Sequence, residues 1–126
     1  MKKKISSKKA PAAIGPYSQG IETDHLIFLS GQIPLDPETM QLVEGDENQI
    51  RQVFKNIDAL CTEAGLNMNH IVKLNVSLHD LSLFSLVNEI MKELFTEPYP
   101  ARAALQVARL PLDSSIEVEA ILAKTI

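Results

Sequence analysis

The sequence feature that most constrains the fold is an apolar stripe with helical spacing in residues 46–64. Asp46 and Gln49 have the spacing of a capping box at its start, and Gly65 occupies the usual position of a C-terminal capping glycine. Burial of such a stripe contributes on the order of 10 kcal/mol before opposing terms. We therefore expect this helix to pack on a sheet through Ile50, Val53, Phe54, Ile57, Leu60, Cys61 and Ala64.

A second apolar stripe predicts another helix between Asp80, a candidate N-cap, and Pro98. Runs with β-strand character surround the two helices. They predict a hairpin over residues 20–29, strands near 71–78, 102–109 and 115–124, and a short extra strand near Lys4-Ile5. The order ββαβαββ predicts a single α+β domain over residues 1–126, with two helices on one face of the sheet.

The opposite face of this sheet is expected to lie against another subunit. Several strands carry apolar or small side chains on both sides, as in Ile27-Phe28-Leu29 and Ile121-Leu122-Ala123. A sheet face of this composition is usually covered rather than left in water. The pattern therefore predicts an oligomer and leaves the number of copies open.

Composition excludes several classes of protein. With 45% hydrophobic and 22% charged residues, the chain is ordinary for a soluble globular protein, and no apolar run is long enough for a membrane span. A signal peptide would have an apolar segment after its basic start, and the basic start of this chain has none, so no signal peptide is expected. The single cysteine favours a cytoplasmic setting. Residues 1–9 hold five of the twelve basic residues and are expected to form a partly flexible terminus, while the acidic remainder disfavours nucleic-acid binding.

Arg102 is the first candidate for chemistry, since it follows Pro100 at the start of a predicted strand. It could bind a small carboxylate through two parallel hydrogen bonds, or pair across a hairpin with Glu117 or Glu119. Spacing alone favours the structural pairing for Arg102. Arg109 has the same two options, and there the structural role is favoured more strongly. Glu117 and Glu119 share one strand face. Two carboxylates close together tend to raise the pKa of one of them, which would suit a general acid or base. The simpler interpretation is a polar strand face without a catalytic role.

The loop over residues 10–20 is expected to be ordered and to present Tyr17, Ser18 and Gln19, because it contains two prolines. The strand after it ends in Ser30-Gly31, a hydroxyl beside an approachable backbone. Hydroxyls in such places are more often structural than functional.

Other site chemistries lack support in the sequence. Cys61 falls on the apolar stripe and is expected to be a core thiol. The spacing of His25, His70 and His79 does not predict a metal site, and there is no serine-hydrolase, phosphate-loop or dinucleotide motif.

A series of motifs resembles the RidA (YjgF) family of reactive-intermediate deaminases over nearly the whole chain, from about Ile5 to Ala123. These motifs are Gly15-Pro16-Tyr17-Ser18-Gln19, Ser30-Gly31-Gln32-Ile33-Pro34, Asn56 with Ala64-Gly65-Leu66, Pro100-Ala101-Arg102, Val107-Ala108-Arg109-Leu110-Pro111 and Ile116-Glu117-Val118-Glu119-Ala120.

The resemblance implies a chorismate-mutase-like fold and a homotrimer whose sheets form a central barrel, with pockets between subunits. It implies hydrolysis of 2-imino acids and their enamine tautomers, such as 2-iminobutanoate and 2-iminopropanoate, to 2-keto acids and ammonia, without a metal or organic cofactor. Arg102 matches the arginine that holds the substrate carboxylate, and Glu117 matches the acidic residue that positions or activates water. Tyr17, Ser30 and the backbone of Gly31 match the pocket wall.

Two departures from the family pattern concern substrate binding. Many members have cysteine at the position of Ala104, whose backbone N–H can still reach a ligand carboxylate. The segment Glu97-Pro98-Tyr99-Pro100 is shorter than usual, so we expect a different pocket rim and substrate size. Two alternative functions stay open: a non-catalytic trimer that binds small carboxylates, and an interaction protein of the endoribonuclease or translation-inhibitor type.

Overall fold

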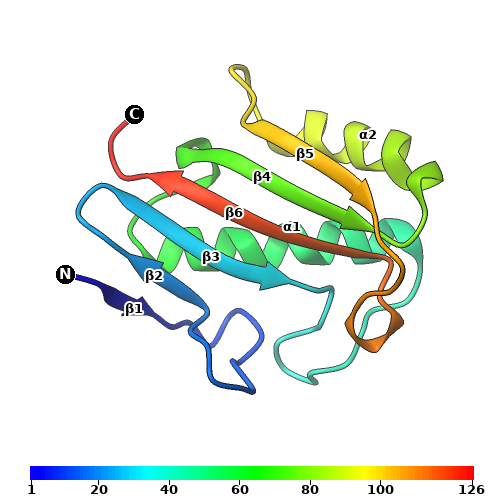
Figure 1. Cartoon of the computed structure of the whole chain (residues 1–126), viewed down its shortest axis with the longest axis horizontal. Coiled ribbons are helices and arrows are strands. Elements are labelled where there is room, and N and C mark those ends of the chain that lie inside the picture. Colours follow the sequence, from blue (N-terminus) through cyan, green and yellow to red (C-terminus); the bar gives the residue numbers. More distant parts are fainter.

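The computed structural model describes residues 1–126 as one six-stranded mixed sheet with both α-helices on the same face (Figure 1). The strands are β1 (Lys3–Ile5), β2 (Gly20–Glu22), β3 (Leu26–Gln32), β4 (Ile71–Leu78), β5 (Ala101–Gln106) and β6 (Ile116–Ala123). The helices are α1 (Asp46–Glu63) and α2 (Phe84–Leu94), with short 3-10 turns η1 (Met68–His70), η2 (Leu81–Leu83) and η3 (Pro111–Asp113). The predicted α+β class and the predicted order of elements are confirmed, and the extra N-terminal strand is present.

The sheet order is β1-β2-β3-β6-β4-β5, and only β4 and β5 run parallel. The prediction that the last two strands form a hairpin is wrong, because β4 lies between β5 and β6. Strand β5 also ends earlier than predicted, at Gln106. Residues 107–115 then carry the chain past the end of β4 to its other side, as Figure 1 shows.

The hydrophobic core lies between the two helices and the sheet face that they cover. Every predicted stripe residue of α1 from Ile50 to Cys61 is buried there, and Phe54 meets Phe95 edge to face at a centroid distance of 5.7 Å. Cys61 lies in this core, where burial, and secondarily the charge of Asp58, raises its pKa to about 12. The thiol is therefore protonated near neutral pH, in agreement with the predicted structural role.

The start of α1 differs from the predicted capping box. Gly45 is the N-cap, with a φ of 92° that favours glycine, and no side chain caps the helix. The carboxylate of Asp46 instead accepts a hydrogen bond from the Ser115 hydroxyl at 2.7 Å, and the Gln49 side chain accepts one from the Ser115 N–H at 2.8 Å. These two polar side chains fasten the helix to the start of β6 rather than to its own first turn.

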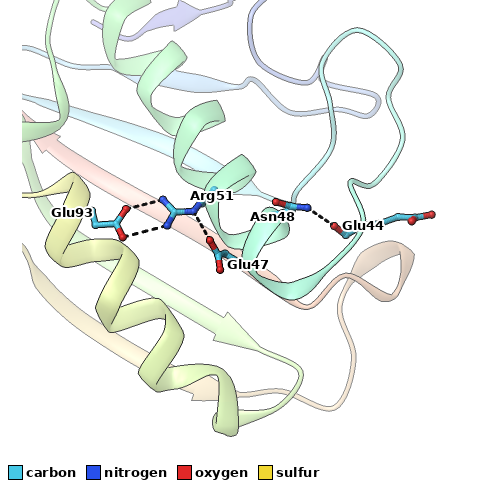
Figure 2. Close-up of polar contacts among 5 residues, drawn as sticks. All are labelled: Glu44, Glu47, Asn48, Arg51 and Glu93. Atoms are coloured by element: carbon cyan, nitrogen blue, oxygen red, sulfur yellow. Dashed lines mark hydrogen bonds and ion pairs between the residues drawn. The ribbon is translucent and has the colours of Figure 1, made fainter.

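The second helix is tied to the first by an ion pair, and it lacks the predicted cap by Asp80, since its N-cap is Leu83 without a side-chain hydrogen bond. Asp80 accepts a hydrogen bond from the N–H of Ser82 at 2.8 Å, which caps η2 directly before α2. Arg51 of α1 donates to both carboxylate oxygens of Glu93 on α2, at 2.9 and 3.3 Å, and to Glu47 at 3.0 Å (Figure 2). The charge of Arg51 is thus compensated by two carboxylates.

The sheet face without helices, called the open face below, keeps apolar side chains at the surface. Phe28 of β3 is 43% exposed and Leu105 of β5 is 62% exposed. Ile121 of β6 lies directly beside Phe28 in the register. Neither helix is both long and apolar enough to cross a membrane.

Candidate functional site

The loop before β2 is built around the side chain of Gln19. Its amide donates to the carbonyls of Pro11, Ser7 and Ala10 at 2.7, 3.0 and 3.2 Å, and its oxygen accepts from the N–H of Ser7 at 2.6 Å. The prediction that the loop presents Gln19 at its surface is therefore wrong, since this residue is only 4% exposed. Gln19 shapes the loop instead, and Tyr17 at the loop surface is 51% exposed.

The end of β3 brings a hydroxyl and a bare backbone beside this loop. The Ser30 hydroxyl donates to the carbonyl of Ser18 at 2.6 Å, and the Ser30 N–H donates to the carbonyl of Gln19 at 3.0 Å. The pairing of β3 with β6 shifts register between Leu29 and Gln32, as at a β-bulge. The shift lies at Ser30 and Gly31, between the paired residues Leu29 and Gln32.

Gly31 lies directly against the carboxylate of Glu117. A Cβ added at Gly31 would overlap Oε2 of Glu117 and lie 3.0 Å from its Cδ. Only glycine leaves this space free, so the position of the carboxylate depends on residue 31.

Glu117 and Glu119 share the open face of β6, as predicted. The pKa of Glu117 is raised above its ordinary value, first because the side chain is half-buried and second because of the nearby charge of Glu119. Glu119 accepts a hydrogen bond from the Asn75 amide at 3.1 Å. A raised carboxyl pKa keeps Glu117 closer to the range in which it can exchange a proton with a ligand or water.

One cavity of about 640 Å³ collects most of the residues that the sequence analysis selected. Its lining includes Tyr17, Ser30, Gly31, Glu117 and Glu119. Segments far apart in the chain thus meet at one place on the open side of the sheet.

Arg102 lies elsewhere, on the sheet face that the helices cover. It stands beside the buried Leu74 in the β4–β5 register, whereas Glu117 stands beside Ser77 in the β4–β6 register. Leu74 and Ser77 are three residues apart on one strand and therefore point to opposite faces. The predicted structural pairing of Arg102 with Glu117 or Glu119 within one chain is wrong. Strand β4 lies between their strands, and their side chains are on opposite faces of the sheet.

The guanidinium of Arg102 is held by three uncharged groups of α2. Its Nη1 donates to the Asn88 side-chain oxygen at 2.7 Å and to the Met91 sulfur at 3.4 Å, and its carbon Cζ lies 4.6 Å from the centroid of the Phe84 ring. A second cavity, of about 470 Å³, contains Arg102 together with Tyr99 and Pro100 of the short segment before β5. Ala104 follows on the same strand and packs partly buried against the core.

The arginines of this chain differ in how their charges are compensated. Arg51 pairs with Glu47 and Glu93, and Arg109 pairs with Asp113 at 2.8 and 3.3 Å on an exposed turn. Arg109 thus forms a structural ion pair as predicted, but its partner is Asp113 and not Glu117 or Glu119. Arg102 alone has no carboxylate partner in the chain. Its half-buried charge is available to an anionic ligand.

Asn88 is the residue of this arrangement that the sequence analysis did not select. The available signal was an amide beside the apolar stripe of α2. Its meaning depends on a contact with Arg102 that only the tertiary structure creates.

Replacement of Gly31 with alanine tests the contact with Glu117. The new methyl group must displace the Glu117 carboxylate, which is the movable end of its side chain, so we expect the free energy of unfolding to fall by only about 0.5–1.5 kcal/mol. Gly15→Ala is the matched control, because a Cβ there meets only the Tyr17 ring at 3.5 Å, an ordinary contact. Urea unfolding of both variants measures the difference, and equal stabilities would contradict the close packing.

Comparisons with known proteins agree with this architecture. The family model described as Endoribonuclease L-PSP matches residues 7–124. A RutC family protein of Pyrococcus abyssi is 50% identical over 95% of both chains. The 2-iminobutanoate/2-iminopropanoate deaminase of Mus musculus is 48% identical and covers 96% of this chain and 90% of its own.

Solved structures match along the whole fold. RidA from the Antarctic bacterium Psychrobacter sp. PAMC 21119 is 50% identical, with a TM-score of 0.94 over 96% of this chain and 98% of its own. The structure of E. coli TdcF with bound serine is 40% identical, with a TM-score of 0.94 over 98% of this chain and 99% of its own. On its sequence, its six-stranded sheet and these relatives, the chain belongs to the RidA family.

Proposed function

We propose that this protein hydrolyses reactive 2-imino acids and their enamine tautomers to 2-keto acids and ammonia, with 2-iminobutanoate and 2-iminopropanoate as substrates. The observation that carries the proposal is Arg102, a half-buried guanidinium in a preformed cradle without a carboxylate partner. Such a group suits a small substrate carboxylate, which it can bind through two parallel hydrogen bonds. The deaminase named among the relatives supports the same reaction.

The proposed active site needs a second copy of the chain. Arg102 and Glu117 lie on opposite sheet faces of one subunit, so one ligand can reach both only at an interface. We propose a homotrimer of the single domain 1–126, in which edge strand β5 of one subunit lies beside the Tyr17–Glu117 cavity of the next. The two patches differ, so the contact is head to tail and closes into a ring. The apolar side chains of the open face, such as Phe28, would line the barrel at its centre.

In this site the protein mainly orients an already electrophilic substrate. Arg102 holds the carboxylate, with the backbone N–H of Ala104 as a second donor from an edge strand. Glu117 of the adjacent subunit accepts a proton from water while the water oxygen bonds to the imine carbon. That proton passes to nitrogen and gives a carbinolamine. Glu117 then takes the proton of the carbinolamine hydroxyl and returns it to the nitrogen as the C–N bond breaks, so that the C=O bond forms and ammonia and the keto acid are released. Proximity and a preformed charge arrangement supply the rate.

The size of the substrate is proposed to be small. Tyr99 and Pro100 of the short 97–100 segment line the Arg102 cavity. The serine bound in the TdcF structure is a small carboxylate-bearing ligand held by a relative of the same fold. This bound ligand favours imino acids with short side chains.

An imine-trapping assay tests the proposed activity. A threonine dehydratase generates 2-iminobutanoate, and semicarbazide traps it as a semicarbazone. We expect added protein to lower semicarbazone formation in proportion to its concentration and to raise ammonia release. Unchanged trapping by the wild-type protein would overturn the deaminase proposal, and binding of 2-ketobutyrate without any effect on trapping would identify the non-catalytic alternative.

The RNA-directed alternative has less support. Endoribonuclease is the description of the matching family model. The cavity that contains Tyr17, however, carries the carboxylates of Glu117 and Glu119, which repel a phosphate backbone.

We propose a cytoplasmic location for the protein. Its single cysteine, Cys61, is a free and buried thiol. A thiol of this kind suits a reducing compartment.

A further inference from the structure

We propose that Asn88 on α2 is a positioning residue, which orients the guanidinium of Arg102 while leaving its positive charge for the substrate carboxylate. The inference rests on the proposed function and deepens it, because it assigns a specific task to a residue outside the predicted site. Asn88 acts through Arg102 and is not itself proposed to touch the reacting atoms.

Three side chains on one side of α2, called the clamp below, hold the guanidinium of Arg102. Phe84, Asn88 and Met91 are spaced by four and three residues, so they share a helix face, and each contacts the guanidinium. The hydrogen bond from Nη1 to Asn88 is short at 2.7 Å, and the aromatic ring lies against the same group at 4.6 Å. Three contacts from a rigid element leave the side chain little freedom before a ligand arrives.

The clamp also determines which edge of the guanidinium stays free. Both hydrogen bonds of the guanidinium use Nη1, whose two N–H groups are directed to Asn88 and Met91. The Nε–H and Nη2–H groups make no hydrogen bond within the chain, and they form the parallel pair that binds a carboxylate side-on. The clamp thus presents a two-donor edge to the ligand.

The neutrality of the clamp is the feature that we infer to matter. An amide oxygen, a thioether sulfur and an aromatic ring orient a cation without cancelling its charge. Aspartate at position 88 would keep the hydrogen-bonding geometry and add an ion pair, like those of Arg51 and Arg109. It would therefore compete with the substrate for the same charge.

Asn88→Asp and Asn88→Ala separate positioning from a merely structural role. We expect the Kd for 2-ketobutyrate, measured by titration calorimetry, to rise at least tenfold in Asn88→Asp and about threefold in Asn88→Ala, where the charge stays but its orientation is lost. The melting temperature of Asn88→Asp should not fall below that of the wild type. A structural role would instead leave ligand affinity in Asn88→Asp close to the wild-type value.

Asn48→Asp is the matched control, since it makes the same change of charge on α1, where Asn48 donates to the Glu44 carbonyl and lies outside the Arg102 cavity. We expect its Kd to change less than threefold. In an Arg102→Ala background, Asn88→Asp should cause no further loss of affinity. The proposed role of Asn88 would be overturned by an unchanged Kd in Asn88→Asp, by an equal effect of Asn48→Asp, or by no binding of 2-ketobutyrate to the wild type.

The proposed function fails separately from the clamp. If the wild-type protein does not lower semicarbazone formation but the expected order of Kd values holds, the deaminase proposal is wrong and the clamp stands. If the wild type lowers trapping and the order of Kd values fails, the clamp is wrong and the deaminase stands.

Discussion

Replacement of Arg102 with alanine is expected to lower the deaminase rate with 2-iminobutanoate by about 100-fold or more. The substrate carboxylate would lose charge-assisted hydrogen bonds, each worth about 1.5–3 kcal/mol, and would no longer be oriented toward the attacking water. The Kd for 2-ketobutyrate should rise together with the loss of rate. The imine-trapping assay and calorimetry measure the two effects on the same protein samples.

Arg109→Ala is the control for this prediction. It removes an arginine that is only a few residues away and pairs with Asp113 on an exposed turn. We expect the rate to stay within about twofold of the wild type, because exposed ion pairs contribute little. Activity in Arg102→Ala equal to that in Arg109→Ala would remove Arg102 from the site.

Replacement of Glu117 with glutamine is expected to lower the rate by about 10²–10⁴-fold and, at neutral pH, to increase stability. The rate falls because glutamine cannot accept a proton from water. Stability rises because the folded state raises the pKa of Glu117, first through burial and then through Glu119, and therefore disfavours the ionised form.

The pH dependence of this gain follows from the sign of the shift. Below the pKa of an unfolded glutamate, near 4.3, the carboxyl is protonated in both states and Glu117→Gln should change stability little. As the pH rises through the higher folded pKa, the wild type acquires the cost of a half-buried charge and the variant does not. Urea unfolding at acid and neutral pH, at one protein concentration, measures the difference. Glu119→Gln should stabilise less, and greater wild-type stability at neutral pH would contradict the prediction.

Local sequence patterns predicted where the helices and strands lie better than they predicted which strands pair in the sheet. The stripe of α1 is buried from Ile50 to Cys61, and that of α2 is largely buried although Leu94 is 41% exposed. Helical spacing reports which side of a helix faces the core. Strand alternation reports faces in the same way but does not say which strands pair. The insertion of β4 between β5 and β6 therefore could not be predicted from spacing. The start of α1 also differed, because Ser115 from a distant segment binds Asp46 and Gln49.

The same distinction applies to the candidate site. Tyr17, Ser30, Gly31 and Glu117 were predicted from motifs, and they line one cavity. The role of Gln19 within its loop and the contact of Asn88 with Arg102 depend on tertiary contacts across 12 and 14 residues. Arg102 stands apart from Glu117 because they lie on opposite faces of one sheet, and a single sequence carries no direct sign of an interface that would unite them.

Co-assembly of Arg102→Ala and Glu117→Gln subunits tests the central claim most directly. If each site takes Arg102 from one subunit and Glu117 from the next, a randomly mixed equimolar assembly has intact sites at about one interface in four. We predict that the mixture recovers about a quarter of the wild-type activity in the imine-trapping assay, while each variant alone stays nearly inactive. A mixture no more active than the separate variants, with mixed assembly verified by mass spectrometry, would contradict a deaminase site shared between subunits.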